Sequence, residues 1–508
     1  MAVETVQRVA LTLQDQLPVL EILVPFVSAP LIVLLGSRRL AWLLAMLASI
    51  SSTVVAFLLL MQVIDGGVIS YQLGGWAPPL GIEYRVDAAN ALVLLLVSAI
   101  AAIILPYARE SLKTEVPERH HTLFYAAFML ALTGLLGVAI TGDAFNVFVF
   151  LEISSLSTYV LVAQGSYRDK RALTAAYNYL IMGTIGATFF VIGLGLLYMS
   201  TGTLNMADLA DQIVINGVNR TISAAFAFIV VGIGLKVAIY PLHLWLPNAY
   251  TYAPSAVSSF IAATATKVAV YVLLRFMFTV FQPSFLGETN TLEFIILPFA
   301  LLAMFAASFI AIFQNDFKRM LAYSSIAQIG YMLLGISFMT QAGLTATIIH
   351  LFNHGITKAA LFMGVGAFVM RGKGSFLTQI SGVGKTMPWT SAAVVIAGFS
   401  LIGVPGTAGF ISKWLLVQAA LEKGWWPIAV LVLLSSLLAV IYVWQVVETM
   451  YLKPVTEDTP TREAPLSMLI PIWILALSTI YFGLNTELTL TAAQTAAQGL
   501  MAGSSGMQ

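Results

Sequence analysis

A series of long, continuous apolar segments constrains this chain more than any other feature. Fourteen segments are about 20 residues or longer, the length that an α-helix needs to cross the hydrocarbon core of a bilayer. Only 9% of the 508 residues are charged, against roughly 25% in a soluble domain, and the mean hydropathy is +0.92. A β-barrel is excluded because its strands alternate in short segments. The sequence therefore predicts an all-α polytopic membrane protein with about fourteen transmembrane helices.

The expected helices divide the chain into four parts. Residues 1–121 hold the first three helices, 122–281 and 292–450 each hold five, and 466–508 hold the last helix and a tail. The expected limits are 18–36, 40–62, 87–107, 122–141, 144–164, 174–199, 222–247, 254–281, 292–313, 319–338, 343–370, 388–421, 425–450 and 466–484.

Basic residues are distributed unevenly among the expected loops. Loops after odd-numbered helices carry fifteen Lys and Arg, and loops after even-numbered helices carry three. The positive-inside rule then predicts that the odd loops lie in the cytoplasm and that both termini lie on the opposite side of the inner or plasma membrane. The odd set is Arg38, Arg39, Arg109, Lys113, Arg119, Arg168, Lys170, Arg171, Lys318, Arg319, Arg371, Lys373, Lys385, Lys453 and Arg462, and the even set is Arg85, Arg220 and Lys423.

Several kinds of protein are disfavoured. Met1 to Pro18 has no basic n-region and no small-residue cleavage site, which predicts that no signal peptide is removed. The chain has no cysteine, so disulfides, thiolate metal sites and iron–sulfur ligation are ruled out. A Walker A loop and a strand-linked GxGxxG motif are not evident. We therefore expect no cofactor, no nucleic-acid binding and no catalytic residues.

A few charges remain inside the apolar segments. An ionisable group near the bilayer centre costs roughly 2.5–3.5 kcal/mol on insertion scales unless it is paired or hydrated. For Arg275 we expect a snorkelling side chain or a structural ion pair, whereas for Glu152, Lys236 and Lys413 we favour a transport role. We expect Glu152 to be the only deep carboxylate. The basic residues are Lys236, Lys267, Arg275, Lys358 and Lys413, and the acids nearer segment ends are Glu21, Asp143 and Glu448.

Two charged segments also contain helix breakers. Pro241 follows Lys236 by five residues, and Pro405 precedes Lys413 in a glycine-rich stretch. Interrupted helices in corresponding positions indicate a transport site built from internal repeats. The two segments are the seventh and the twelfth, so we expect two inverted five-helix repeats, helices 4–8 and 9–13.

Histidines and lysines gather in the same part of the chain. His350, His354 and Lys358 recur every four residues and share one helix face, while His243 lies near the seventh-helix break. Histidine is the side chain whose unperturbed pKa lies nearest neutral, so such a line can pass protons. The alternative is a pair of core histidines satisfied by hydrogen bonds. A metal site is disfavoured by the poor ligand supply.

Three motifs carry a resemblance to a known family. GLKVAIYPLHLWLPNAYTYAPSAVSSFIAATATKVAVYVLLRF, NDFKRMLAYSSIAQIGYMLLGI and HLFNHGITKAALF resemble the antiporter-like membrane subunits shared by Mrp-type cation/proton antiporters and NADH:quinone oxidoreductase. The resemblance covers roughly helices 3 to 13. It implies fourteen helices with inverted repeats and a chain of buried charges. In this chain Glu152 pairs with Lys236, and Lys267 is the eighth-helix lysine. The motif that connects the two repeats contains His354 and Lys358, and Lys413 ends the pathway.

One position separates branches of this family. Lys413 stands where the respiratory subunits of similar length typically carry glutamate, and the loop YQLGGWAPPLGIEYRVDAANALVLLL is also similar to the D subunits of Mrp-type antiporters. The resemblance thus implies a proton-translocating subunit of a multisubunit Na⁺/H⁺ antiporter, with other subunits, protons, a monovalent cation and the lipid bilayer as partners. The alternatives are a proton-pumping subunit of a redox-driven complex, a membrane scaffold whose charges fix helix register, and a transporter for an organic solute.

Overall fold

We describe the chain from a computed structural model, which covers residues 14–372, 374–457 and 462–502. The expectations about the first thirteen residues, Lys373 and the last six residues lie outside this range. The helices of the first half are α1 (Leu17–Leu35), α2 (Arg38–Gly66), α3 (Ala88–Glu115), α4 (His121–Ile140), α5 (Ala144–Ala163), α6 (Arg171–Thr201), α7 (Met206–Asn216), α8 (Arg220–Val237), α9 (Trp245–Tyr252), α10 (Ser255–Ala263), α11 (Ala265–Leu274) and α12 (Gln282–Thr289). Those of the second half are α13 (Leu297–Ile312), α14 (Phe317–Ser337), α15 (Gln341–Arg371), α16 (Val383–Thr386), α17 (Pro388–Ile402), α18 (Ala408–Glu422), α19 (Trp426–Tyr451), α20 (Leu466–Leu484) and α21 (Glu487–Ala502).

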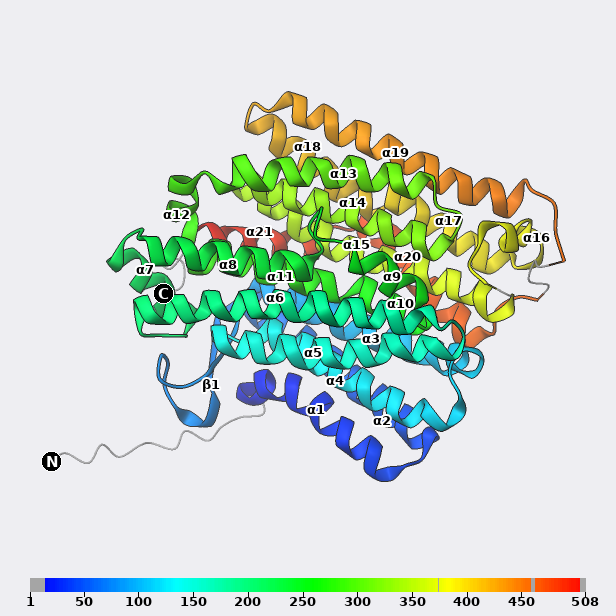
Figure 1. The fold of residues 1–508 in the computed structure, drawn as a ribbon, viewed down its shortest axis with the longest axis horizontal. Coiled ribbons are helices and arrows are strands. Elements are labelled where there is room, and N and C mark those ends of the chain that lie inside the picture. Colours follow the sequence, from blue (N-terminus) through cyan, green and yellow to red (C-terminus); the bar gives the residue numbers. More distant parts are fainter. Residues whose placement is uncertain (1–13, 373, 458–461, 503–508) are drawn as a thin grey trace.

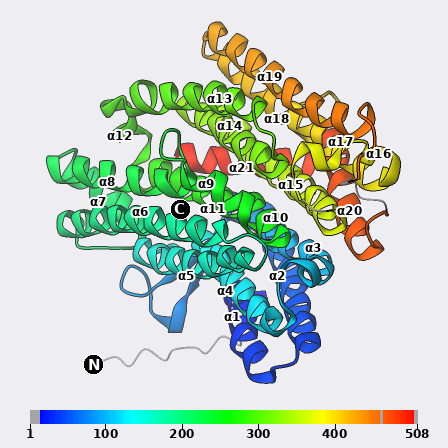
Figure 2. The same ribbon diagram turned by 45° about the vertical axis from the view of Figure 1, so that its right-hand side comes forward.

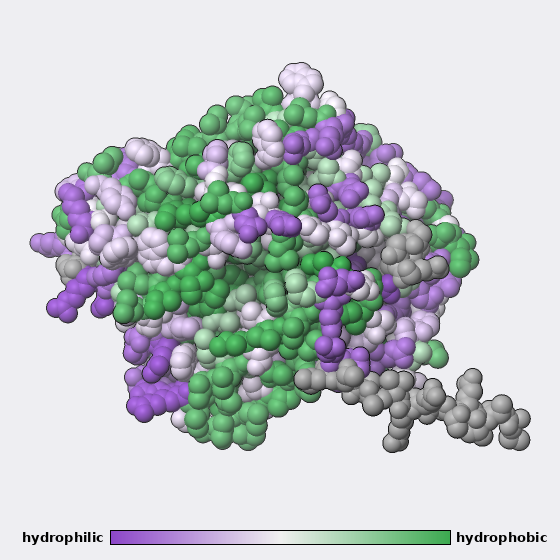
Figure 3. All heavy atoms as spheres, turned by 180° about the vertical axis from the view of Figure 1, so that it is seen from behind, coloured by the Kyte–Doolittle hydropathy of each residue, from purple (hydrophilic) through white to green (hydrophobic). Residues whose placement is uncertain are grey.

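The protein is a predominantly helical, polytopic membrane protein. Within the described ranges, twelve helical segments are long and apolar enough to cross a membrane. The long helices run roughly parallel, with α16 at one end of the bundle and α7 and α12 at the other (Figure 1). On the back of the molecule apolar side chains cover the flanks, and hydrophilic ones gather toward the ends (Figure 3). This distribution fits a bundle surrounded by lipid.

The two edges of the bundle come from different parts of the chain, and the last helices, α20 and α21, return to its middle beside α3 and α15. In both ribbon views α1 and α2 form one edge, and α18 and α19 form the opposite edge (Figures 1 and 2). The 31-residue helix α15 is packed against α10, α14 and α18. Its residues from Gly343 to Val369 are all buried. The line of His350, His354 and Lys358 therefore lies in protein surroundings.

Glycine allows some helices to approach very closely. Gly186 of α6 and Gly232 of α8 face each other, and a Cβ atom at Gly232 would lie 2.6 Å from the carbonyl oxygen of Gly186. Small residues at helix contacts are typical of membrane bundles, because close packing supplies the attraction that lipid does not.

A small sheet departs from the all-α expectation. Strands β1 (Ile69–Gln72) and β2 (Glu83–Val86) pair antiparallel in the loop between α2 and α3. An isolated bridge from Tyr84 to Thr141 then ties this hairpin to the end of α4. The apolar pattern did not reveal these strands because each has only four residues.

Three helices are interrupted inside the bundle. Between α8 and α9 the chain leaves the helix at Ala238 (φ 63°), and between α17 and α18 it turns at Gly403 (φ 92°) and Gly406 (φ 86°). Pro241 and Pro405 lie within these two breaks. The third interruption, at Thr264 between α10 and α11, has no proline or glycine and was not expected. Residues 487–502, expected as a tail, form the additional helix α21.

Candidate functional site

The first candidate element is an ion pair beside the break after α8. Lys236 is in the last turn of α8, and its Nζ donates a hydrogen bond to Ser155 Oγ at 2.6 Å and lies 3.4 Å from Glu152 Oε1, both on α5. The side chains of Lys236 and Glu152 are 9% and 26% exposed. The ammonium thus has one neutral and one charged partner, and losing the charged one would leave it bound to a hydroxyl alone.

Lys267 is held at the unexpected break in the next segment. Its Nζ donates to the carbonyl oxygen of Ala262 at 2.5 Å and lies 3.4 Å from Thr266 Oγ1, and the residue is fully buried. Ala262 lies in the last turn of α10, where helix carbonyls lack intrahelical partners. Among the described residues, Lys267 has no carboxylate partner. The structure shows no direct hydrogen bond between Lys236 and Lys267, so a proton passing between them needs water.

The polar line on α15 lies in the middle of the molecule. The rings of His350 and His354 stack with centroids 5.9 Å apart, and His350 Nδ1 bonds to Ser412 Oγ at 2.8 Å. Both ring nitrogens of His354 lack a hydrogen-bond partner in the described part of the chain. Lys358 donates to Leu321 O at 2.8 Å and to Ser324 Oγ at 2.5 Å on α14. Buried polar atoms are normally satisfied, so the ring nitrogens of His354, free within the described residues, favour a proton-relay role over that of a core histidine bonded to protein groups.

A small cavity adjoins these histidines. It has a volume of about 10 Å³ and is lined by residues that include Gln328, His350, His354 and Ser412. A space of this size and polarity is near the minimum for one water molecule. A water there could bridge polar groups of α15 and α18.

Lys413 lies on α18 after the second break. Its Nζ donates to Leu401 O at 3.1 Å and Ile402 O at 2.7 Å, the last carbonyls of α17, and it lies 4.9 Å from the centroid of the Tyr331 ring. Tyr331 also lies beside His350, with centroids 5.7 Å apart. Lys413 therefore adjoins the end of the α15 line.

His243 and Arg275 make no hydrogen bond to the lysines and histidines described above. His243, inside the first break, is 5% exposed and stacks on Tyr240 with centroids 4.8 Å apart. Its Nδ1 has no partner within the described residues. Arg275 pairs with Asp87 at 2.7 Å and also bonds to Tyr271 and Thr279. Arg275 is thus half of a structural ion pair rather than a side chain that snorkels to the interface.

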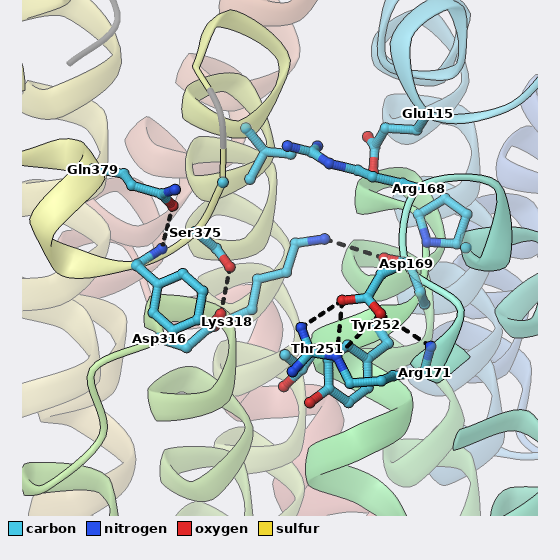
Figure 4. Close-up of a pocket in the computed structure, with 16 residues that line it drawn as sticks. Glu115, Arg168, Asp169, Arg171, Thr251, Tyr252, Asp316, Lys318, Ser375 and Gln379 are labelled. Carbon is cyan, nitrogen blue, oxygen red and sulfur yellow. Dashed lines mark hydrogen bonds and ion pairs between the residues drawn. The ribbon is translucent and has the colours of Figure 1, made fainter. Parts of the chain in front are cut away.

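A polar pocket, here called the vestibule, is lined by the loop after α5, the end of α9 and the start of α14 (Figure 4). Its volume is about 250 Å³, and its charged lining combines three carboxylates with three cations, namely Glu115, Asp169, Asp316, Arg168, Arg171 and Lys318. Hydrogen bonds from Arg171 hold the pKa of Asp169 below its ordinary value. Figure 4 shows the Lys318 side chain extended across the space, and its Nζ donates to Ala253 O at 3.1 Å. The vestibule therefore reaches the first turn of α14, one turn before Leu321, which binds Lys358.

Buried carboxylates are what the sequence interpretation missed. Glu115 is 5% exposed and accepts hydrogen bonds from Ser111 and from the backbone and hydroxyl of Ser255. Glu21 is fully buried. Glu115 and Glu21 are therefore buried carboxylates near helix ends, and the expectation that Glu152 is the only carboxylate deep in the membrane stays a prediction. Position near the end of an apolar segment did not predict exposure, because neighbouring helices and the β1–β2 hairpin cover these ends.

These features define a polytopic membrane subunit with a buried line of ionisable groups at interrupted helices. The chain belongs to the family described as "NADH:quinone oxidoreductase/Mrp antiporter, TM", whose model matches residues 141–439. It is 38% identical over 489 residues to the N subunit of NADH-quinone oxidoreductase of Desulforudis audaxviator, covering 93% of this chain and 96% of that protein. It is 32% identical over 428 residues to the D subunit of the Na(+)/H(+) antiporter of Alkalihalophilus pseudofirmus, covering 84% of each protein.

Solved structures show the same fold. A chain of the Mrp complex from Dietzia sp. DQ12-45-1b is similar with a TM-score of 0.87 and 26% identity, over 97% of this chain and 98% of that one. A chain of the membrane-bound sulfane sulfur reductase, an archaeal respiratory membrane complex, is similar with a TM-score of 0.89 and 30% identity, over 96% of this chain and 98% of that one. Both neighbours are subunits of multisubunit membrane complexes.

Proposed function

We propose that this protein is the proton-translocating subunit of a multisubunit monovalent cation (Na⁺)/H⁺ antiporter, a secondary transporter subunit rather than an enzyme. The observation that carries the proposal is the partly buried Glu152–Lys236 pair at a helix break. The relative named as the D subunit of an Na(+)/H(+) antiporter supports it. Partners are then the other subunits of the antiporter complex.

A redox-driven proton pump is the second candidate. It is favoured by the 38% identity to an N subunit of NADH-quinone oxidoreductase. The buried line of this chain would serve either machine, because both move protons and differ in what drives them. The subunits that accompany the chain in a purified complex distinguish the two: antiporter subunits support the first, and quinone or hydrogenase modules support the second.

The proposed membrane topology has fourteen crossings. Adding α15 and the interrupted α17–α18 pair to the twelve apolar spans gives this number, and the two proline-containing breaks then fall in corresponding helices of two inverted five-helix repeats, at 122–281 and 292–450. The basic loops, and with them the vestibule, face the cytoplasm. Both termini face the other side.

Proton movement in this proposal begins at the pair. With Glu152 close, its carboxylate stabilises the ammonium of Lys236. When Glu152 moves away, the buried ammonium keeps only Ser155 as a partner and gives up its proton, because a lone charge in apolar surroundings is costly. Water in the break around Pro241 and His243 then carries the proton to Lys267.

The remaining steps follow α15. His350, His354 and Lys358 pass the proton along one helix face, and Lys413, bound to the end of α17, releases it toward the opposite side. No cofactor or resident metal takes part in this route.

Replacing Lys236 with alanine tests the proposal. In membrane vesicles that contain the assembled complex, the variant is expected to lose proton-coupled cation exchange, because the route loses its first buried acceptor. Assembly is checked on a native gel, and Lys113→Ala, in an exposed ion pair with Glu110, is the control. Normal exchange by a normally assembled Lys236→Ala complex would contradict the proposal.

A further inference from the structure

A second buried carboxylate lies far from the proton route. Glu21, on the edge helix α1 (Figures 1 and 2), is fully buried. Neither of its carboxylate oxygens has a hydrogen-bond partner among the described residues. Buried carboxyl groups are normally bonded, and the contrast with Glu115, which accepts three hydrogen bonds, shows what a structural acid looks like in this protein.

The backbone carbonyl of Glu21 lacks its usual helical donor. Pro25 lies four residues later inside α1 and has no N–H to donate to the carbonyl of Glu21. The residue thus presents a carboxyl group and a carbonyl without its usual helical donor in one turn of the helix. Both are hard oxygen ligands, which suit alkali and alkaline-earth cations.

Two serines of α2 lie at the same depth. Glu21 is fourteen residues before Leu35, and Ser52 is fourteen residues after Arg38 on the other arm of the short α1–α2 turn. Ser49 lies one helical turn from Ser52. Both hydroxyls are buried and unpartnered within the described chain, whereas other buried hydroxyls, such as those of Ser98 and Thr133, bond to the preceding helical turn.

The elements packed on α1 supply no countercharge to Glu21. These elements are α2, α4, β2 and the short turn at Gln14–Gln16. Burial raises the pKa of Tyr84 on β2 to about 12, so this phenol stays neutral. The other titratable groups lie toward element ends or on the hairpin and the N-terminal turn, and are Arg38, Arg39, Asp65, His121, Tyr125, Glu83, Arg85 and Asp15.

An unpaired buried carboxylate is prohibitively costly, so the group must be neutral. A bound proton or a bound monovalent cation achieves this equally. We propose that Glu21, with Ser49 and Ser52, forms a site at which a proton and an alkali cation of the Na⁺ class exchange. In this exchange the protonated carboxyl and M⁺ give a carboxylate–M⁺ pair and a released H⁺, so charge is conserved.

This site would provide cation binding away from the lysine-rich line. The role of this exchange in transport rests on the proposed function. Cation binding at Glu21 does not, because it does not require the route through Lys236. The two ideas can therefore fail separately.

Na⁺-dependent proton release from the purified complex tests the site. The complex is held in a weakly buffered detergent solution with a pH indicator, and NaCl is added, with choline chloride as the control salt. The parent complex is expected to release protons on NaCl only, and Glu21→Gln is expected to abolish the release assigned to this chain. Lys236→Ala is expected to keep the release while losing vesicle exchange.

Two further measurements keep the test informative if Glu21→Gln does not fold. Infrared difference spectra of the parent complex should lose a protonated-carboxyl band on adding Na⁺. The double variant Ser49→Ala/Ser52→Ala should raise the half-saturating Na⁺ concentration about tenfold, while Ser98→Ala leaves it unchanged. Full proton release by Glu21→Gln, or a carboxyl band that Na⁺ does not alter, would overturn the proposal.

Discussion

Replacing Glu152 with glutamine separates its charge from its shape. Two unit charges 3.4 Å apart, the distance from Glu152 Oε1 to Lys236 Nζ, attract by about 5 kcal/mol at an effective dielectric constant of about 20. The amide oxygen of glutamine can still accept a hydrogen bond from the Lys236 ammonium, so the variant is expected to lose an estimated 2–3 kcal/mol, roughly half of this attraction. If the pair loads the proton onto Lys236, the loss corresponds to a fall in exchange of about 30- to 160-fold.

The assay is proton-coupled Na⁺ exchange in vesicles, normalised to the amount of assembled complex. Glu110→Gln is the matched control, because it neutralises an exposed ion pair with Lys113 at 2.8 Å outside the route. Glu152→Asp keeps the charge and is expected to retain more activity than Glu152→Gln. Glu152→Gln with exchange within a factor of about two of the parent, or a similar loss in Glu110→Gln, would refute the role of the pair.

Three other predictions concern stability and pH. Arg275→Ala should lower the stability to thermal unfolding in detergent by about 3 kcal/mol, the lower end for a broken buried pair, because Asp87 remains 22% exposed; a cost no greater than that of the exposed-pair variant Arg171→Ala would contradict this. Gly232→Ala should destabilise the α6–α8 contact by about 1–3 kcal/mol, since its Cβ would lie 2.6 Å from Gly186 O. The control variant Gly195→Ala has open space around the new methyl group and should not be destabilised. Equal unfolding temperatures for the two variants would exclude the close approach. Arg171 holds the pKa of Asp169 below its ordinary value. The contribution of this carboxylate to the free energy of unfolding is therefore complete above the ordinary value of about 3.9 and is lost only as the pH falls through the lowered value. Asp169→Asn should leave the pH profile of exchange near neutrality unchanged, and a shifted profile would show that Asp169 takes part in exchange.

The sequence predicts the membrane-spanning helices and two of their interruptions better than it predicts which side chains pair across the fold. Continuous apolar runs predict helices because backbone groups in lipid must be bonded within the segment, and Pro241 and Pro405 mark two interruptions by their chemistry. The break at Thr264 has no such residue. Likewise Asp87, the partner of Arg275, is 188 residues away, and the burial of Glu21 depends on helices packed around it. These features arise from tertiary packing, which the local pattern does not encode.

The three breaks explain why lysines and helix breakers occur together in lipid. Lys267 binds a carbonyl in the last turn of α10, and Lys413 binds the last carbonyls of α17, so each ammonium sits at the negative end of a half-helix. Such an end stabilises a cation by about 0.3–1 kcal/mol, and up to about 2 kcal/mol when partly buried. The cost of burying an ammonium without a carboxylate is several kcal/mol. A half-helix therefore orients the lysine without holding its charge permanently. Lys236 differs in having Glu152 as a charged partner, and this makes it the position where a small movement of one carboxylate changes the charge of the whole line.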